Sequence, residues 1–206
     1  MLRCSNDTHS MMDLSLTHIG LLIATAILLS VVFLFVFSND WQRNAELQAQ
    51  ASSFSNLLID IDNSFFEQTS IFRFSHEDFP YSVRISTEYI VLSAKGSWQN
   101  TQSVAHRFLI RPWLRSTQLN WTTGGDLHTY LNETYGHMGT QEDPITKQNF
   151  SFFFQQLNNT TAFFASQPLE LLINEPVYIE KTIVFYDENK RYDILLLYQL
   201  MEEVPN

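Results

Sequence analysis

The stretch HIGLLIATAILLSVVFLFVFSNDWQRNAELQAQASSFSNLL, residues 18–58, decides how this chain folds. Its first half, residues 19–37, carries no charged side chain and consists mainly of Leu, Ile, Val and Phe. A helix of this length measures about 28 Å, close to the thickness of the hydrocarbon layer of a bilayer. A cleaved secretory signal ends in small residues, whereas this run stays bulky to its end. The sequence therefore predicts an uncleaved transmembrane helix over 19–37 that acts as a signal anchor.

The polar second half of the stretch has the pattern of an amphipathic helix. No Pro or Gly occurs between Leu21 and Gln68, so we expect one helix to continue beyond residue 37, with an extension over 38–68. Apolar residues recur there at gaps of four and three, which places them on one helix face. This stripe consists of Leu47, Ala51, Phe54, Leu58, Ile61 and Phe65. It is predicted to pack on the chain's own head domain, and contacts with neighbouring copies stay open as a second role.

Composition excludes several classes of function. The chain has 206 residues and a formal net charge of −10, which argues against a nucleic-acid partner because such partners are bound by clustered Lys and Arg. The one cysteine, Cys4, precedes the apolar run. The rest of the chain therefore offers no disulfide, thiolate metal site or cysteine nucleophile.

Period-two alternation begins near Tyr81 and predicts a β-rich head over 69–206. One strand is expected in YSVRISTEYIVLSAKG (81–96), and a second in VAHRFLIRPW (104–113) after a turn. A hairpin is expected where PVYIEKTIVFY and RYDILLLYQL flank DENK, with the short strand PLELLIN (168–174) before it. The core-facing positions of the first strand are predicted to be Val83, Ile85, Tyr89 and Val91. We expect about five strands in one antiparallel sheet.

A helical insert is predicted between the strands, over about 123–160. Asp126 follows a Gly-Gly turn as the expected N-cap of a first helix, and Gly136 is the expected residue just past its end. A second helix is expected in DPITKQNFSFFFQQLNN (143–159), whose Phe cluster docks the insert on the sheet. The predicted fold class is thus α+β: a long N-terminal transmembrane and amphipathic helix followed by an antiparallel β-sheet head with a helical insert.

A search for catalytic and binding patterns gives few candidates. The group nearest to a metal site is Asp126, His128, Glu133 and His137, but its spacing does not point the ligands the same way, and capping and surface roles explain these residues better. Nucleotide-binding glycine loops and nucleophile elbows are missing from the sequence. We therefore predict no enzyme activity, no cofactor, no metal and no small-molecule substrate.

Two surface features remain as candidate interaction sites. A basic, aromatic segment is a predicted docking patch for an acidic partner or a glycan, with local ion pairing as the alternative; it consists of Arg107, Arg111, Arg115 and Trp113. N-glycosylation triplets begin at Asn120, Asn132, Asn149, Asn158 and Asn159. These triplets favour a short cytoplasmic N-terminus, 1–18, and a head outside the cell membrane.

The layout resembles that of archaeal type IV pilin-like proteins, a family of membrane-anchored surface proteins. The resemblance lies in LSLTHIGLLIATAILLSVVFLFVF (14–37), ELQAQASSFSNLLIDID (46–62) and ISTEYIVLSAKG (85–96). It implies a helix that holds the subunit in the bilayer before assembly and packs against the helices of other subunits in a filament. It also implies that a peptidase trims a short basic leader. The leader here has only Arg3 as a basic residue, and the Glu usual inside the processed N-terminus is missing.

The predicted function is that of a single-pass, membrane-anchored, extracytoplasmic protein with a structural or interaction role, as a minor pilin-like subunit or a component of a surface apparatus. The predicted partners are the lipid bilayer and other pilin-like or membrane subunits. The alternative is a membrane-tethered binding or sensing module that does not polymerise.

Overall fold

A computed structural model of the chain describes residues 7–76, 78–95, 101–115, 121–188 and 190–200. Within the first helix, α1 (Asp7–Asp62), the side chains of 7–17 and 35–39 lie outside this description. The chain forms two compact units, Met1–Arg43 and Asn44–Asn206. The second unit, called the head below, contains the C-terminal part of α1 and every strand that the described residues form.

The structure corrects the membrane prediction. Crossing the hydrocarbon layer takes about 20 consecutive apolar residues. The described side chains of α1 are those of 18–34 and 40–62, and within them no helical stretch is long and apolar enough to span a membrane. This finding contradicts the transmembrane helix over 19–37, the signal anchor and the single-pass membrane localisation that the sequence predicted.

The head has an α+β fold with two four-stranded sheets rather than the single antiparallel sheet that was expected. Sheet A has the order β1-β7-β8-β5, in which β5 pairs in parallel with β8, and sheet B has the order β4-β3-β2-β6. The strands of sheet A are β1 (Gln68–Phe72), β7 (Val177–Tyr186), β8 (Lys190–Tyr198) and β5 (Trp113–Leu114). Those of sheet B are β4 (Thr101–Arg107), β3 (Tyr89–Lys95), β2 (Tyr81–Ile85) and β6 (Leu169–Leu171).

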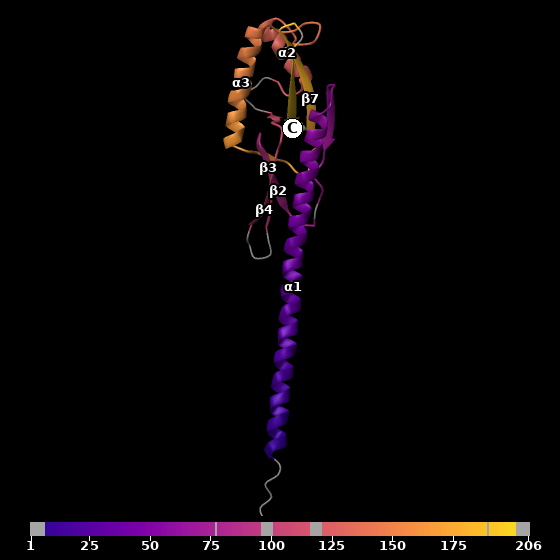
Figure 1. Cartoon of the computed structure of the whole chain (residues 1–206), viewed down its shortest axis with the longest axis vertical. Helices are drawn as coiled ribbons and strands as arrows, with labels where there is room; N and C mark the ends of the chain where they lie inside the picture. The colour runs from indigo at the N-terminus through magenta and orange to yellow at the C-terminus, as the bar shows by residue number, and fades with distance from the viewer. Residues whose placement is uncertain (1–6, 77, 96–100, 116–120, 189, 201–206) are drawn as a thin grey trace, which may run out of the picture. The chain divides into compact units, whose positions relative to one another are not determined.

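Sheet A separates two hydrophobic cores. Alternate residues of β8 face opposite sides, so that Leu195 and Leu197 belong to one core, and Leu196 and Tyr198 belong to the other. The first core also contains the stripe of α1 and the inner face of sheet B. The second core is closed by α2 (Gly124–Tyr135) and α3 (Lys147–Ser166). In Figure 1, α3 and the C-terminal part of α1 accordingly lie on opposite sides of β7.

The segment expected to form one strand over 81–96 forms a hairpin instead. The chain reverses between β2 and β3, where the Ser86 amide bonds to the Tyr89 carbonyl at 2.8 Å and the Glu88 amide to the Ser86 hydroxyl at 3.1 Å. The turn changes which positions face inward. Val83 and Ile85 are buried as predicted, but in β3 the buried positions are Ile90, Leu92 and Ala94 rather than Tyr89 and Val91.

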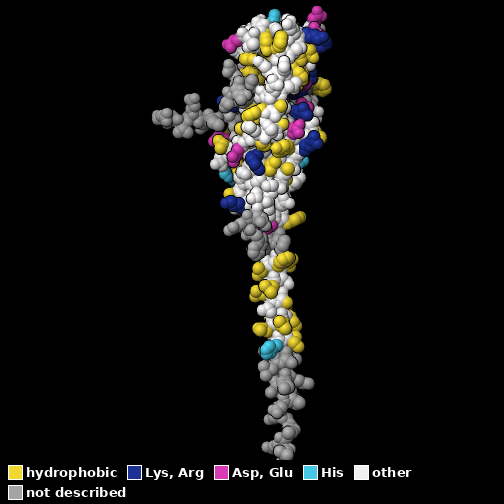
Figure 2. Space-filling view, turned by 90° about the vertical axis from the view of Figure 1, so that its left-hand side faces the viewer, with side chains coloured by type: hydrophobic (Ala, Val, Ile, Leu, Met, Phe, Trp, Pro, Cys, Tyr) yellow, Lys and Arg dark blue, Asp and Glu magenta, His cyan; other side chains and the backbone are white. Residues whose placement is uncertain are grey.

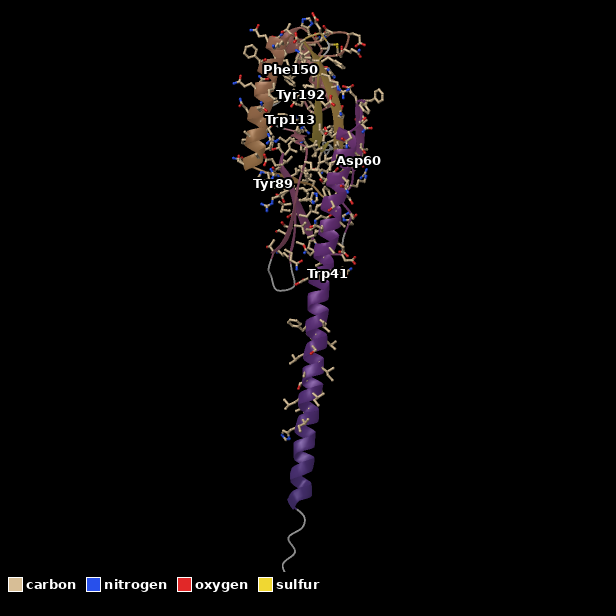
Figure 3. All side chains as sticks on the ribbon, viewed as in Figure 1. Trp41, Asp60, Tyr89, Trp113, Phe150 and Tyr192 are labelled. Atoms are coloured by element: carbon tan, nitrogen blue, oxygen red, sulfur yellow. The ribbon has the colours of Figure 1, made fainter. Side chains whose placement is uncertain are left out.

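The helical insert forms as α2 and α3. Thr123, and not Asp126, is the N-cap of α2; Asp126 occupies the third helical position and completes a capping box with it. Gly136 ends α2 with a φ of 77°, a left-handed conformation that favours glycine, as the sequence predicted. Phe150 of α3 stacks on Tyr186 at 3.8 Å and contacts Tyr192 edge-on, which docks the insert on sheet A (Figure 3).

A buried lysine holds the end of α1 in the head. Lys181 of β7 is 1% exposed, and its ammonium group donates to the Asp62 carbonyl at 2.5 Å and the Ser64 carbonyl at 2.7 Å. It also pairs with the Asp193 carboxylate at 2.8 Å. The bond to Asp62 satisfies one of the carbonyl groups that a helix end leaves without an intrahelical partner, and the bond to Ser64 fixes the segment that follows. They hold the end of α1 at Asp62, and Phe65, the last residue of the predicted stripe, lies beyond this end.

Candidate functional site

The longest run of exposed apolar side chains among the described residues is in the part of α1 over 18–34, called the apolar helix segment below. Its large apolar side chains are 51–68% exposed and point in every direction around the helix axis. Figure 2 shows hydrophobic side chains along this segment, with no Lys, Arg, Asp or Glu among them. They are Ile19, Leu21, Leu22, Ile23, Ile27, Leu28, Leu29, Val31, Val32, Phe33 and Leu34. Soluble proteins rarely leave so large an apolar surface uncovered, so the segment is a candidate interaction site.

The predicted stripe lies in a different environment from the apolar helix segment, packed in the head, which is the first of the two roles considered from the sequence. Leu47, Ala51, Phe54 and Leu58 are fully buried, and Ile61 is nearly so, all in the first core of the head. These five side chains are therefore not available to neighbouring copies. Phe65 continues the spacing of the stripe in the sequence, but it lies beyond the end of α1 and is 77% exposed.

Phe65 and Phe66 form a second exposed apolar feature, called the Phe65–Phe66 turn below. The two side chains are 77% and 78% exposed. The backbone that carries them is nevertheless fixed, because the Ser64 hydroxyl donates to the Phe66 carbonyl at 3.0 Å and accepts from the Phe66 amide at 3.2 Å. Arg191 of β8 donates to the Phe65 carbonyl at 3.4 Å.

A cavity of about 530 Å³ adjoins this turn and is called the head cavity below. Its wall includes Glu67 and His128. The His128 ring is held in place by a hydrogen bond between its Nδ1 and the Met138 carbonyl, at 2.7 Å. Nε2 of the same ring lies 3.6 Å from Oε1 of Glu67, which also accepts the Ile183 amide at 2.8 Å. The cavity is lined by Phe65, Phe66, Glu67, His128, Thr140, Gln141, Glu142, Ile183, Phe185 and Arg191.

The residues of the predicted basic docking patch do not share one surface environment. Trp113 is only 6% exposed and lies in the second core, so its ring is not part of a docking surface (Figure 3). Arg111 contacts the Glu88 carboxylate at 3.4 Å, and Arg115 donates to the Gln199 carbonyl at 3.3 Å. Arg107 is exposed at the end of β4. Ion pairing with a local carboxylate, the alternative considered from the sequence, describes Arg111, whereas Arg115 bonds a backbone carbonyl.

The polar residues of the insert have structural roles. His137 Nδ1 lies 2.6 Å from Oδ1 of Asp143, and the other oxygen of this carboxylate accepts the Met138 amide. The hydrogen bond to His137, followed by that to the Met138 amide, lowers the pKa of Asp143. Hydrogen bonds at the start of α2, from the Thr123 backbone first, lower the pKa of Asp126. Within the described part of the chain, no group of His, Cys, Asp and Glu residues is placed to hold a metal ion.

The glycosylation triplets have different positions. Asn132, Asn158 and Asn159 are exposed on helices, and Asn149 is partly buried in the first turn of α3. Asn120 lies outside the described residues. The use of these triplets stays a prediction.

The head cavity was not found from the sequence, because its walls come from five separate segments between Phe65 and Arg191. The only local sign was the apolar pair Phe65–Phe66 directly after the predicted helix. Comparisons with protein-family models, curated proteins and solved structures find no match for this chain.

Proposed function

We propose that this protein is a structural subunit that assembles with other copies by packing the apolar helix segment against their helices, in the manner of a pilin-like protein. The observation that carries the proposal is the contrast within α1. The stripe over 47–61 is already buried in the head, whereas the side chains over 18–34 are exposed on all sides.

The distribution of the apolar side chains favours more than two copies. A helix that uses one partner has one apolar stripe, and a helix that is apolar all round is surrounded by its neighbours. Ile27 and Val31 lie on the side of the helix opposite to Leu22 and Leu29 at 100° per residue, and all four are more than half exposed. A single partner helix would leave one of these pairs in contact with water.

The energetics agree with this distribution. Full burial of a Leu, Ile, Val or Phe side chain stabilises by about 1.5–3 kcal/mol, so covering eleven side chains that are 51–68% exposed is worth on the order of 10–20 kcal/mol per subunit. Association costs about 4–15 kcal/mol in lost freedom of motion. Covering only one face, about a third of this surface, would not clearly exceed that cost.

The proposal is tested by sedimentation of the full chain and of two double variants. Leu22→Gln with Leu29→Gln changes one face, and Ile27→Gln with Val31→Gln changes the opposite face. We expect the unchanged protein to sediment as an assembly of more than two copies, and each double variant to raise the dissociation constant about a hundredfold or more.

The matched control is Leu109→Gln, which changes an apolar side chain of the head that is 87% exposed. It should leave the assembly unchanged. Disruption by only one of the two double variants would mean a two-helix contact. A wild-type protein that sediments as a monomer would refute the proposal.

A second candidate function is that of a binding module that does not polymerise. The observation that favours it is the head cavity beside two exposed phenylalanines. This candidate does not account for the apolar helix segment, and we therefore place it second.

A further inference from the structure

The strongest unexplained surface of the head is the Phe65–Phe66 turn together with the head cavity. Two large aromatic side chains that are about three-quarters exposed are costly to leave in water, and aromatic residues, Phe included, are enriched in the cores of protein interfaces. We propose that this surface binds a segment of a partner protein that presents a Lys or Arg side chain next to an apolar residue.

The apolar part of the site is preorganised. The hydrogen bonds of Ser64 fix the backbone on both sides of Phe65, and the Lys181 ammonium group fixes the Ser64 carbonyl at 2.7 Å. A partner that packs on Phe65 and Phe66 therefore loses little affinity to ordering of this turn. A flexible loop of the same composition would bind more weakly.

The charged part of the site favours a cation. The lining contains the carboxylates of Glu67 and Glu142, one guanidinium group, that of Arg191, and the His128 ring, which lies 3.6 Å from Glu67. Arg191 is already engaged, since it lies 3.1 Å from the Asp193 carboxylate and donates to the Phe65 carbonyl. Among the described residues, Glu142 takes part in no hydrogen bond or ion pair, so its charge is available to a ligand.

The size of the cavity agrees with a side chain rather than a folded element. A volume of about 530 Å³ exceeds that of one Lys or Arg side chain and lies in the range of pockets that hold small ligands. The phenylalanine rings at the rim add a cation–π contribution of about 0.5–1 kcal/mol for an exposed contact, on top of the two carboxylates. An anionic or purely apolar segment would gain only part of these interactions.

The test measures binding of two dye-labelled peptides to the full chain by fluorescence anisotropy. The probes are acetyl-Leu-Lys-Leu-Lys-amide and the matched acetyl-Leu-Glu-Leu-Glu-amide. We expect the lysine peptide to bind and the glutamate peptide not to bind. The affinity for the lysine peptide should fall as salt is raised from about 50 mM to about 500 mM, because exposed ion pairs are screened.

Variants assign the binding to this surface. Phe65→Ser with Phe66→Ser should weaken binding of the lysine peptide about tenfold or more, and Glu142→Gln should weaken it several-fold. Matched controls are Leu109→Ser, which removes an exposed apolar side chain elsewhere on the head, and Glu133→Gln, which removes an exposed charge on α2. Both should leave the affinity unchanged. Tryptophan fluorescence in urea checks that every variant remains folded.

Three outcomes would overturn the proposal. One is failure of the lysine peptide to bind at about 1 mM. Another is equal binding of both peptides, or equal loss with the control variants, which would indicate attraction to the net negative charge of the chain alone. The third is self-association that disappears in the Phe65→Ser, Phe66→Ser variant while neither peptide binds, which would assign the surface to a second copy.

Discussion

Replacement of Phe54 by alanine is expected to destabilise the head strongly. Phe54 is fully buried, and its ring centroid lies 5.1 Å from that of Phe72, 5.7 Å from Phe74 and 6.1 Å from Phe108. Truncation of a buried Phe to Ala costs about 3–5 kcal/mol, which includes the cavity that it leaves. Since the free energy of unfolding of a domain is about 5–15 kcal/mol, we expect Phe54→Ala to remove a large part of the stability of the head.

The assay is urea unfolding of the full chain followed by tryptophan fluorescence, because Trp113 and Trp121 are buried in the head. With a slope of about 2 kcal/mol per molar urea, a loss of about 4 kcal/mol lowers the midpoint by about 2 M. The matched control is Phe65→Ala, the same change at a side chain that is 77% exposed, which should lower the midpoint by less than about 0.3 M. Equal midpoints for the two variants would refute the assignment of the stripe to the core.

Three further predictions concern the head. Lys181→Met removes the donor of the Asp62 and Ser64 carbonyls and leaves Asp193 with Arg191 as its remaining partner at 3.1 Å, so it should lower the free energy of unfolding by about 1–3 kcal/mol in the same urea assay. A loss below about 0.5 kcal/mol would contradict this role. Gly124→Ala places a Cβ 2.1 Å from the Thr182 hydroxyl and should destabilise by about 1–3 kcal/mol, whereas Gly125→Ala, whose nearest neighbour would be 3.8 Å away, should not destabilise. The hydrogen bonds from His137 and the Met138 amide lower the pKa of Asp143, so the stabilisation that they give is lost as the pH falls through this lowered pKa. The chemical shift of the Met138 amide should therefore titrate with a midpoint below about 3.9, the ordinary pKa of an aspartate, and Asp143→Asn should abolish the titration. A midpoint at or above about 3.9 would contradict this prediction.

The helical parts of the fold were predicted best, because their signals are local. The four-three spacing of apolar residues over 47–61 identified both a helix and the face that is buried. Gly136 was identified correctly as the residue that ends α2, whereas the N-cap is Thr123, three residues before the predicted Asp126.

The sheets were predicted less well, because pairing between distant strands leaves no local pattern. The turn at 86–88 has no Gly or Pro, so the hairpin of β2 and β3 read as one strand, and the buried positions of β3 were assigned to the wrong face. The two-residue β5 and its parallel pairing with β8 had no sequence signal, and the burial of Trp113 depends on that pairing.

The two candidate sites also differ in how far the sequence reveals them. The apolar helix segment was visible in the sequence, but its interpretation as a membrane span is contradicted among the described residues. The head cavity depends on residues up to 126 positions apart, such as Phe65 and Arg191, which only the folded chain brings together.

Site-specific photo-cross-linking around one turn of the apolar helix segment tests the central claim most directly. A photoreactive phenylalanine analogue is placed, one at a time, at Ile27, Leu28, Leu29 and Ser30, which face four directions about 100° apart. If copies pack around the segment, all four positions give covalent links between protein chains, and the same analogue at the exposed Glu133 of α2 gives none. Links to lipid instead of protein at all four positions, or no links between chains at any of them, would contradict the account.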